Sequence, residues 1–440
     1  MWWCRREVGW VMAGEGSALT LGDVVTLQRG TTYKGVLLGQ PGPVLLGLAS
    51  IQRNGGFRDD NLKTYGGDSP EKLILRPGDI YVSLKDVTQS ADLLGSIARV
   101  PLHIPMGRVT QDTVKLTFIR KDVPSRYIYW LLRTPVYREY CRAHAIGTTN
   151  LSIAREDFLA FPVPKPRGRE LTLVETLDAL DDKIELNRRM NATLEAMARA
   201  LFQSWFVDFD PVRAKLDGCQ PTGLDADTAA LFPAHFQDSP LGHIPQGWEA
   251  GTVSDGFNLT MGQSPPGNTY NEEGNGLPFY QGRTDFGFRF PTRRIYCTAP
   301  TRYAKPGDTL VSVRAPVGDI NMADEECCIG RGVAAVRHKS GATSFTYHAM
   351  ANLEPDFAKF EAEGTVFGSI NKQSFENLRF VIPPPQVIAA YEHQAAPLDE
   401  QIHTLEHQSR TLATLRDALL PKLLSGELNI NITNEVQEAL

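Results

Sequence analysis

Basic and polar side chains near glycine-rich loops are the residues of this sequence whose chemistry points to a binding partner. Arg and Lys neutralise phosphates, and Gln, Asn, Arg, Ser and Thr on loops can reach the edges of DNA bases. Two stretches of the chain combine these residue types. The candidate DNA-binding residues of the first stretch are Gln28, Arg29, Thr31, Tyr33, Lys34, Arg53, Asn54, Arg58, Lys85, Thr148, Thr149 and Asn150. Those of the second stretch are Gln263, Gln281, Arg283, Arg293, Arg294, Arg314, Asn371 and Lys372.

The grouping of these residues, and no single one of them, supports this interpretation. For one side chain, solvation at the surface explains the residue type at least as well as a base contact does. Residues 19–168 carry 20 Lys and Arg against 13 Asp and Glu, although the whole chain has a formal charge of −6. In the second stretch, residues 283–314 hold 7 basic residues against 2 acidic ones. Local basic surfaces of this kind allow phosphate to approach an acidic protein.

Motifs for DNA chemistry are missing from the sequence. A base methyltransferase requires an Asn/Asp-Pro-Pro-aromatic loop, but the nearest stretches, 264–267 and 382–385, lack both the amide or acid and the aromatic ring. No Gly-x4-Gly-Lys-Ser/Thr phosphate-binding loop occurs either, which argues against ATP-driven work. The sequence therefore predicts a binding protein without catalytic residues.

Two short motifs could hold a metal, but the sequence favours a structural interpretation of each. Asp181-Asp182-Lys183 fits the acidic-x-Lys ending of the sequence motif of a metal-dependent nuclease site. Its position in a helical repeat nevertheless favours a solvated helix face. His403 and His407 are four residues apart, as zinc ligands on a helix can be, but no third ligand lies nearby in the sequence. The six cysteines form no Cys-x2-Cys pair, so reduced thiols in a cytoplasmic protein are expected. No metal site is predicted.

Two long helices must position the loops, and both carry a heptad pattern of apolar residues. We call these positions the seam. The first seam contains Leu173, Leu177, Leu180, Ile184, Asn187, Asn191, Leu194 and Leu201, and the second contains Leu398, Ile402, Leu405, Leu412 and Leu419. An offset of 218 residues relates the two seams, so the pattern indicates an internal duplication. Asn187 and Asn191 are amides in an apolar seam, where such residues commonly fix register; hydration at the edge of the seam is the alternative.

The duplication extends upstream of both helices. Gly147-Thr148 and a Pro run at 162–166 precede the first helix, and Gly364-Thr365 and a Pro run at 383–385 precede the second. Each copy also contains a Pro-Gly-Asp turn before a strand-like run, at 77–79 and 306–308. The expected fold is of the α+β class. It has two globular mixed α/β domains separated by two long antiparallel helices, which form a coiled coil within a pseudo-two-fold repeat.

The patterns divide the 440-residue chain into seven segments. They are an N-terminal extension at 1–18, with Met12 an alternative start, a first globular domain at 19–168, a central helix at 169–210, a polar connector at 211–247, a second globular domain at 248–384, a C-terminal helix at 385–427 and a tail at 428–440. No apolar run is long enough for a membrane helix. A cytoplasmic protein without a membrane partner is expected.

The chain resembles the DNA-specificity subunits of type I restriction-modification systems. The resemblance spans most of residues 19–428 and is carried by the combination of LGDVVTLQRG, GTTNLSIAREDFLAFPVPKP, LFQSWFVDFDPV, ALFPAHFQDSPLGHIPQGW, PFYQGRTDFGFRF, GSINKQSFENLRFVIPPP and ALLPKLLSGEL. It implies two target-recognition domains, separated by conserved helices, that read a split sequence in double-stranded DNA.

The same resemblance implies partners and places the cofactors on them. Two methyltransferase (modification) subunits and two ATP-dependent restriction subunits would assemble with this chain and would carry S-adenosylmethionine, ATP and Mg2+. The chain itself would bind no cofactor. A self-contained DNA methyltransferase or nuclease is a second hypothesis, which the missing motifs oppose. A coiled-coil adaptor that does not bind DNA is a third, and salt-dependent duplex binding would separate it from the first.

Overall fold

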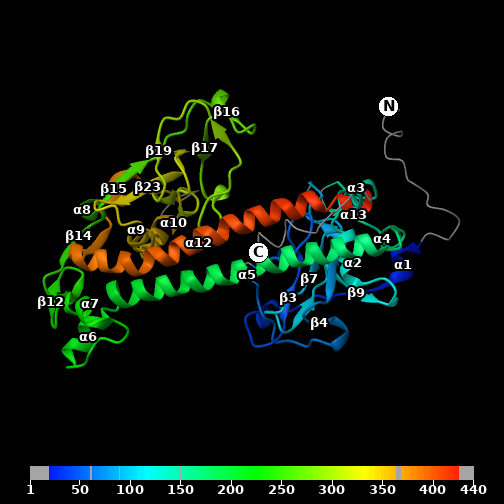
Figure 1. Ribbon diagram of the computed structural model, residues 1–440, viewed down its shortest axis with the longest axis horizontal. Coiled ribbons are helices and arrows are strands. Elements are labelled where there is room, and N and C mark those ends of the chain that lie inside the picture. The colour runs from blue at the N-terminus through cyan, green and yellow to red at the C-terminus, as the bar shows by residue number, and fades with distance from the viewer. Residues whose placement is uncertain (1–18, 60–61, 89, 149, 363–367, 426–440) are drawn as a thin grey trace. The chain divides into compact units, whose positions relative to one another are not determined.

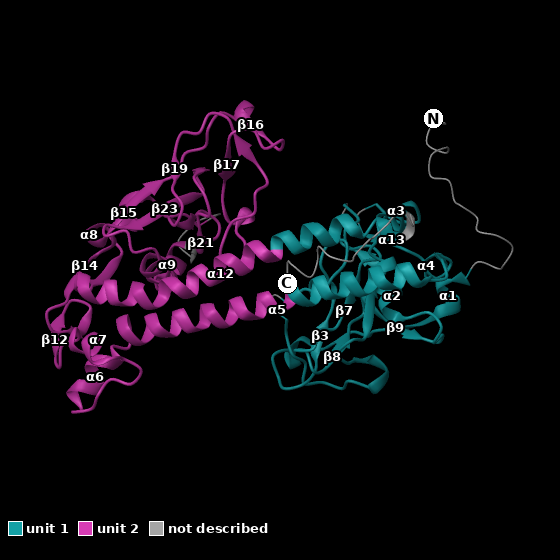
Figure 2. Ribbon diagram, in the orientation of Figure 1, with its two compact units in different colours: residues 1–184, 410–440 teal, residues 185–409 magenta. Residues whose placement is uncertain are grey.

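The fold is described from a computed structural model of residues 19–425, except 60–61, 89, 149 and 363–367 (Figure 1). The predicted N-terminal extension, the predicted tail and Gly364-Thr365 lie outside the described residues. The chain forms two compact units (Figure 2). Unit 1 contains residues up to 184 and from 410 onward, and unit 2 contains residues 185–409. Within the described ranges, no helix combines the length and apolar character required to cross a membrane.

Unit 1 is built on a four-stranded antiparallel sheet and a smaller three-stranded sheet. The larger sheet has the order β2-β9-β5-β7, formed by Val25–Arg29, Thr113–Phe118, Ile80–Ser83 and Ile97–Arg99. The smaller sheet has the order β3-β8-β4, formed by Val44–Leu46, Gly107–Val109 and Ile74–Leu75, with β3 parallel to β8. The other elements are β1 (Leu19–Thr20), α1 (Leu21–Val24), β6 (Lys85–Asp86), α2 (Ser125–Leu131), α3 (Pro135–Ala143), β10 (Leu151–Ser152), α4 (Arg155–Leu159) and β11 (Pro162–Val163).

Unit 2 repeats this arrangement. Its four-stranded sheet has the order β15-β23-β20-β21, formed by Phe257–Met261, Val333–His338, Thr309–Val313 and Val317–Met322. Its second sheet, β16-β18-β17-β22-β19, consists of Tyr270–Asn271, Tyr296–Cys297, Leu277–Tyr280, Cys327–Ile329 and Tyr303–Ala304, and β17 is parallel to β22. The other elements are β14 (Glu249–Thr252), α8 (Val253–Gly256), α9 (Thr343–Asn352), α10 (Glu354–Ala362), α11 (Lys372–Glu376) and β24 (Arg379–Ile382).

Equivalent local interactions accompany the shared strand order. Each four-stranded sheet is entered through a short helix whose preceding Thr is bonded to an Asp three residues later, Thr20 to Asp23 and Thr252 to Asp255. Each Pro-Gly-Asp turn is closed by its aspartate, because the Asp79 and Asp308 carboxylates accept hydrogen bonds from the backbone N–H three residues earlier. Since strand order, strand direction and these local bonds coincide, the predicted internal repeat is confirmed.

The two long helices, α5 (Gly168–Phe206) and α12 (Pro385–Leu419), run antiparallel in each unit. In unit 2, the buried Asn187 donates its Nδ2 hydrogens to Gln408 Oε1, at 2.8 Å, and Ser409 Oγ, at 3.2 Å. Farther along α5, the Tyr391 hydroxyl donates to the Ala198 carbonyl. A later residue of α5 thus meets an earlier residue of α12, as an antiparallel pair requires. Asn187 is inaccessible to solvent, so the alternative of hydration at the edge of the seam does not hold for this residue.

In unit 1, the two helix segments meet the globular core as well as each other. Leu173, Val174 and Leu177 of α5 belong to one core with Leu420 and with Leu423, which lies in the short helix α13 (Lys422–Ser425). Two charged residues join the segments directly, because Arg416 Nη1 lies 2.7 Å from Asp181 Oδ1. All thirteen residues of the predicted seam are buried or half-buried.

The segment predicted as a polar connector, 211–247, is largely folded in unit 2. It contains nearly all of α6 (Asp210–Leu216), followed by α7 (Ala226–Ala230) and the hairpin β12–β13 (Phe236–Ser239 and Gly242–Pro245). Val212, Phe232 and Ile244 are buried in the same core as Trp205 and Trp248. The aromatic residues explain this difference from a simple linker, because they bury large apolar surfaces against the end of α5.

A buried arginine attaches the globular part of unit 2 to both helices. Arg289 is inaccessible to solvent and forms ion pairs with Glu195 of α5 and Asp399 of α12. Its guanidinium also lies over the Tyr347 ring, 3.9 Å from the centroid. Burial opposes the charge, but Tyr347, Asp399 and Glu195 outweigh it and raise the pKa of Arg289 above its ordinary value. The cation is therefore retained where two carboxylates require compensation.

One buried histidine makes the stability of unit 2 dependent on pH. Burial lowers the pKa of His348 to about 4, so the folded state holds this ring neutral while the unfolded state protonates near pH 6.5. The contribution of the neutral ring to the free energy of unfolding is fully present above pH 6.5. It is lost as the pH decreases toward 4, by up to about 3 kcal/mol. His348→Phe should remove this contribution, because a phenyl ring does not titrate. The substitution breaks no hydrogen bond at Nε2, which has no partner among the described residues. Urea unfolding at pH 7.5 and 5.0 measures the difference, and an unchanged pH dependence in the variant would contradict it.

Candidate nucleic-acid interface

One end of the four-stranded sheet of unit 1 gathers most of the predicted DNA-binding residues of that unit. Arg29 ends β2 and donates from Nε to the Gln111 carbonyl, 3.2 Å away, in the turn before β9. The next residue, Asp112, pairs at 3.1 Å with Lys85, which follows β5. Because β2 and β5 both end where β9 begins, the antiparallel sheet brings these two basic side chains to the same end of the sheet.

The loop after β2 is held against this end of the sheet by a buried arginine that is not among the predicted DNA-binding residues. Arg108 donates from Nη2 to Thr31 Oγ1, at 2.8 Å, and lies over the Tyr65 ring. The Tyr65 hydroxyl accepts from the Lys34 backbone N–H, and its ring packs edge-on against Tyr33. Arg108 therefore fixes the backbone of a loop whose Thr31, Tyr33 and Lys34 side chains are exposed.

Two further loops reach the same end of the sheet. Asn54 donates its backbone N–H to the Asp92 carbonyl beside β7, and Arg53 pairs with the Asp92 carboxylate at 3.9 Å. The strand pair β6–β10 sets Ser152 opposite Lys85, which brings the segment with Thr148 and Asn150 close to that lysine. Arg58 is exposed on the first of these loops, and Gln28 is half-buried on β2. Thr149 lies outside the described residues.

In unit 2, the equivalent sheet end borders a cavity of about 710 Å3. Four predicted residues, Gln281, Arg283, Arg294 and Arg314, line it. Arg314 directly follows β20, and Gln263 follows β15 and donates its backbone N–H to the Ile329 carbonyl. In unit 1, Lys85 follows β5 and Arg29 ends β2 at the corresponding end of the sheet. The same end of the same sheet is thus lined by cations and amides in both copies.

A buried aspartate organises the wall of this cavity. Asp285 is 2% exposed, accepts the Gln281 backbone N–H at 3.1 Å and pairs with the Arg294 guanidinium at 2.9 Å. Arg283 pairs with Asp319 at 3.1 Å and remains 62% exposed. The arginines are therefore positioned by carboxylates while their outer surfaces face solvent. Such preorganised guanidinium groups suit phosphate and base recognition.

Other residues of unit 2 differ from the predicted set in position or partner. Arg331 also lines the cavity but is not among the predicted DNA-binding residues. Its place between Gly330 and Gly332 is a sequence signal for a loop that could approach a ligand. Arg293 does not line the cavity and pairs with Glu325. Asn371 and Lys372 are exposed at the start of α11. The Asn371 side chain caps that helix by accepting the Ser374 backbone N–H at 2.9 Å, and Lys372 pairs with Glu376.

Asp181 occupies an ion-pair network, in contrast to the solvated helix face that the sequence favoured. Its carboxylate lies 3.0 Å from Arg133 and 2.7 Å from Arg416, and its side chain is 20% exposed. Burial alone would raise the pKa of Asp181, but the two guanidinium groups outweigh burial and lower it. The neighbouring Asp182 is 80% exposed. A structural role for Asp181 follows, because both of its oxygens are used in holding α5.

Comparisons with known proteins identify relatives of this chain. The family described as "Type I restriction modification DNA specificity domain" matches residues 245–402. Over 319 residues, the chain is 31% identical to a protein assigned as the type I restriction enzyme MjaX specificity subunit of Methanocaldococcus jannaschii, covering 71% of this chain and 70% of the relative. It is also 25% identical to the HindI specificity subunit of Haemophilus influenzae over 314 residues, 58% of this chain and 66% of that protein.

A solved structure supports the fold. The crystal structure of a type I restriction-modification S subunit from M. genitalium matches with a TM-score of 0.57 at 14% identity, covering 92% of this chain and 94% of that one. At this level of identity, the likeness speaks for the fold alone. The predicted fold class is confirmed.

Arg293 and Arg294 provide a matched pair for testing the cavity, since both are exposed to a similar degree, 47% and 53%. Arg294→Ala should weaken duplex binding by roughly 5- to 50-fold, because one positioned cation is lost from the cavity. Arg293→Ala should change affinity by less than about 2-fold, as expected for an exposed charge away from the contact. Fluorescence anisotropy at low salt measures both. Wild-type affinity for the Arg294 variant would exclude the cavity from the interface.

Proposed function

Because the chain belongs to the family of type I restriction-modification specificity subunits, we propose that it binds a bipartite DNA target, using one sheet end in each unit. The observation that carries the proposal is the repeated placement of cations and amides at the same end of two equivalent sheets. Unit 1 presents Arg29 and Lys85 there, and unit 2 presents Arg294 and Arg314. One chain thus offers two separate surfaces of similar framework and different side chains.

The two surfaces would read different half-sites, because their loops differ where their frameworks agree. The loop after β2 is held by a buried arginine, Arg108, whereas the cavity of unit 2 is organised by a buried carboxylate, Asp285. Exposed Gln, Asn and Arg side chains on such loops can distinguish bases in the major groove, while the remaining cations contact phosphates. An asymmetric target in two parts would result.

Catalysis in this proposal belongs to partner subunits. Two methyltransferase subunits would use S-adenosylmethionine, and two restriction subunits would use ATP and Mg2+. The paired helices α5 and α12 are suitable docking surfaces, since exposed apolar residues such as Leu186, Met190 and Met197 lie on α5 outside the buried seam. The chain would supply recognition and assembly, in the cytoplasm, without a catalytic residue of its own.

Exchange of one globular domain tests the division of labour. Replacing residues 19–168 with the corresponding domain of another family member should alter one half of the recognised sequence and leave the other half and the spacer unchanged. Selection of bound duplexes from a randomised pool, with the full-length chain, reads the target directly. The reciprocal exchange of residues 248–384 is the matched control and should change only the other half.

Thermal unfolding shows first that each exchanged protein is folded. A target altered in both halves by one exchange would refute the assignment of one half-site to each unit. Failure of the folded wild-type chain to select any sequence, combined with the absence of salt-dependent duplex binding, would favour the adaptor hypothesis.

A further inference from the structure

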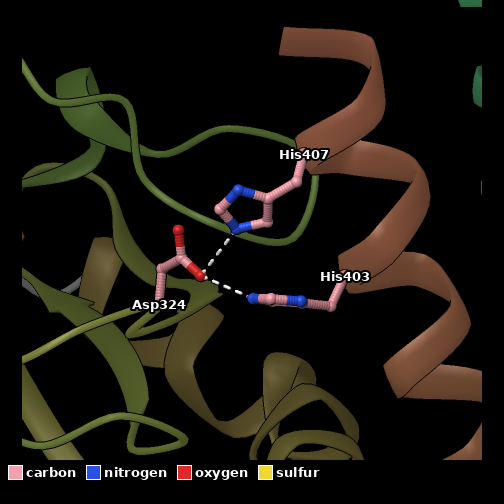
Figure 3. A group of neighbouring side chains, drawn as sticks. All are labelled: Asp324, His403 and His407. Atoms are coloured by element: carbon pink, nitrogen blue, oxygen red, sulfur yellow. Dashed lines mark hydrogen bonds and ion pairs between the residues drawn. The ribbon is translucent and has the colours of Figure 1, made fainter. Parts of the chain in front are cut away.

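Three side chains of unit 2 that are not among the predicted DNA-binding residues converge on one point (Figure 3). His403 and His407 lie one turn apart on α12 and direct their Nε2 atoms to the same oxygen, Asp324 Oδ1, at 2.8 and 3.0 Å. Asp324 comes from the turn between β21 and β22, about eighty residues earlier in the chain. This is the third ligand that the sequence did not place beside the histidine pair.

We propose that Asp324, His403 and His407 bind one divalent transition-metal ion of the zinc type. Two imidazoles and one carboxylate form a ligand set that zinc accepts, with a water molecule in the fourth position. Histidines at positions i and i+4 present both rings on one helix face, as in helical zinc motifs. Magnesium and calcium are not expected, because they prefer oxygen ligands and avoid imidazole.

The distances are compatible with a shared ion. The ligand atoms of the three residues all lie within 4.8 Å of one another. In a tetrahedral zinc site with bonds of about 2.0–2.1 Å, neighbouring ligand atoms are separated by roughly 3.3 Å. The Nε2 to Oδ1 separations of 2.8 and 3.0 Å must therefore lengthen by about 0.3 to 0.5 Å. This adjustment is within the reach of side-chain rotation on α12.

Burial of the ligands leaves a route for the ion. The Asp324 side chain is 6% exposed, whereas His403 and His407 are 46% and 42% exposed. A largely buried carboxylate thus meets two imidazoles that solvent can reach. The Phe290 ring packs edge-on against His403 at 5.1 Å and limits its orientation.

The histidine pair belongs to one copy of the repeat. At the offset of 218 residues, the positions of His403 and His407 correspond to Glu185 and Arg189 on the first helix. The general helix framework therefore does not require imidazoles at these positions. A bound ion would tie the β21–β22 turn to α12 and so strengthen the attachment that Arg289 provides elsewhere in unit 2.

Metal titration of the full-length, tag-free chain tests the proposal. After removal of metals with a chelator, Zn2+ should bind at about one equivalent per chain and raise the melting temperature by roughly 5 °C. Co2+ bound at the same place should show visible d–d bands without thiolate charge transfer, because no cysteine is a ligand. The double variant H403Q/H407Q should bind Zn2+ at least about 100-fold more weakly.

Controls separate a metal site from a hydrogen-bonded group of three residues. His393 is exposed on the same helix, so H393Q should bind as the wild type does. D324N should lose binding while leaving both imidazoles in place. Equal Zn2+ affinity in the wild type and the double variant would overturn the proposal. So would a double variant that unfolds more easily without metal while the wild type binds no Zn2+ or Co2+, since the residues would then act only through hydrogen bonds.

Discussion

The antiparallel register of α5 against α12 is the constraint on which the other features of this protein depend. In unit 2 it is fixed by Asn187, whose buried amide donates to Gln408 and Ser409, and in unit 1 by the ion pair of Asp181 with Arg416. An apolar heptad seam alone allows neighbouring registers, because a shift of one heptad buries similar side chains. Buried polar contacts make one register preferable. Each globular core is built on the helix residues that this register presents to it.

Duplication explains how one chain acquires the two proposed binding surfaces. The two four-stranded sheets share strand order and direction, and Pro-Gly-Asp turns lead into β5 and β20. These features lie in the cores, where packing restricts change. The loops at the proposed binding end of each sheet have few such restrictions, so Arg108 can organise one loop and Asp285 the other. A common framework therefore supports two different surfaces.

Local sequence patterns made much of the fold predictable. Contacts between residues far apart in the sequence could not be predicted from them. Heptad spacing selected seam residues that prove buried or half-buried, and turn residues located the strands β5 and β20. The aromatic contacts of the segment 211–247, the burial of Arg289 and the approach of Asp324 to His403 depend on tertiary structure. Arg331 is absent from the predicted set although Gly330 and Gly332, which flank it, mark a loop that could bend toward a ligand. Several of the predicted cations lie at one sheet end because the order of the strands gathers them there. Strand order cannot be read from local sequence patterns.

Mapping the methylated bases in the DNA of cells that carry this chain with its modification subunit tests the central claim most directly. Two units that each read one half-site predict methylation within a split target, with two specific segments separated by a fixed number of unspecified bases. The pattern should disappear when this chain alone is deleted. Methylation within a single uninterrupted sequence, or methylation that persists without this chain, would contradict the account.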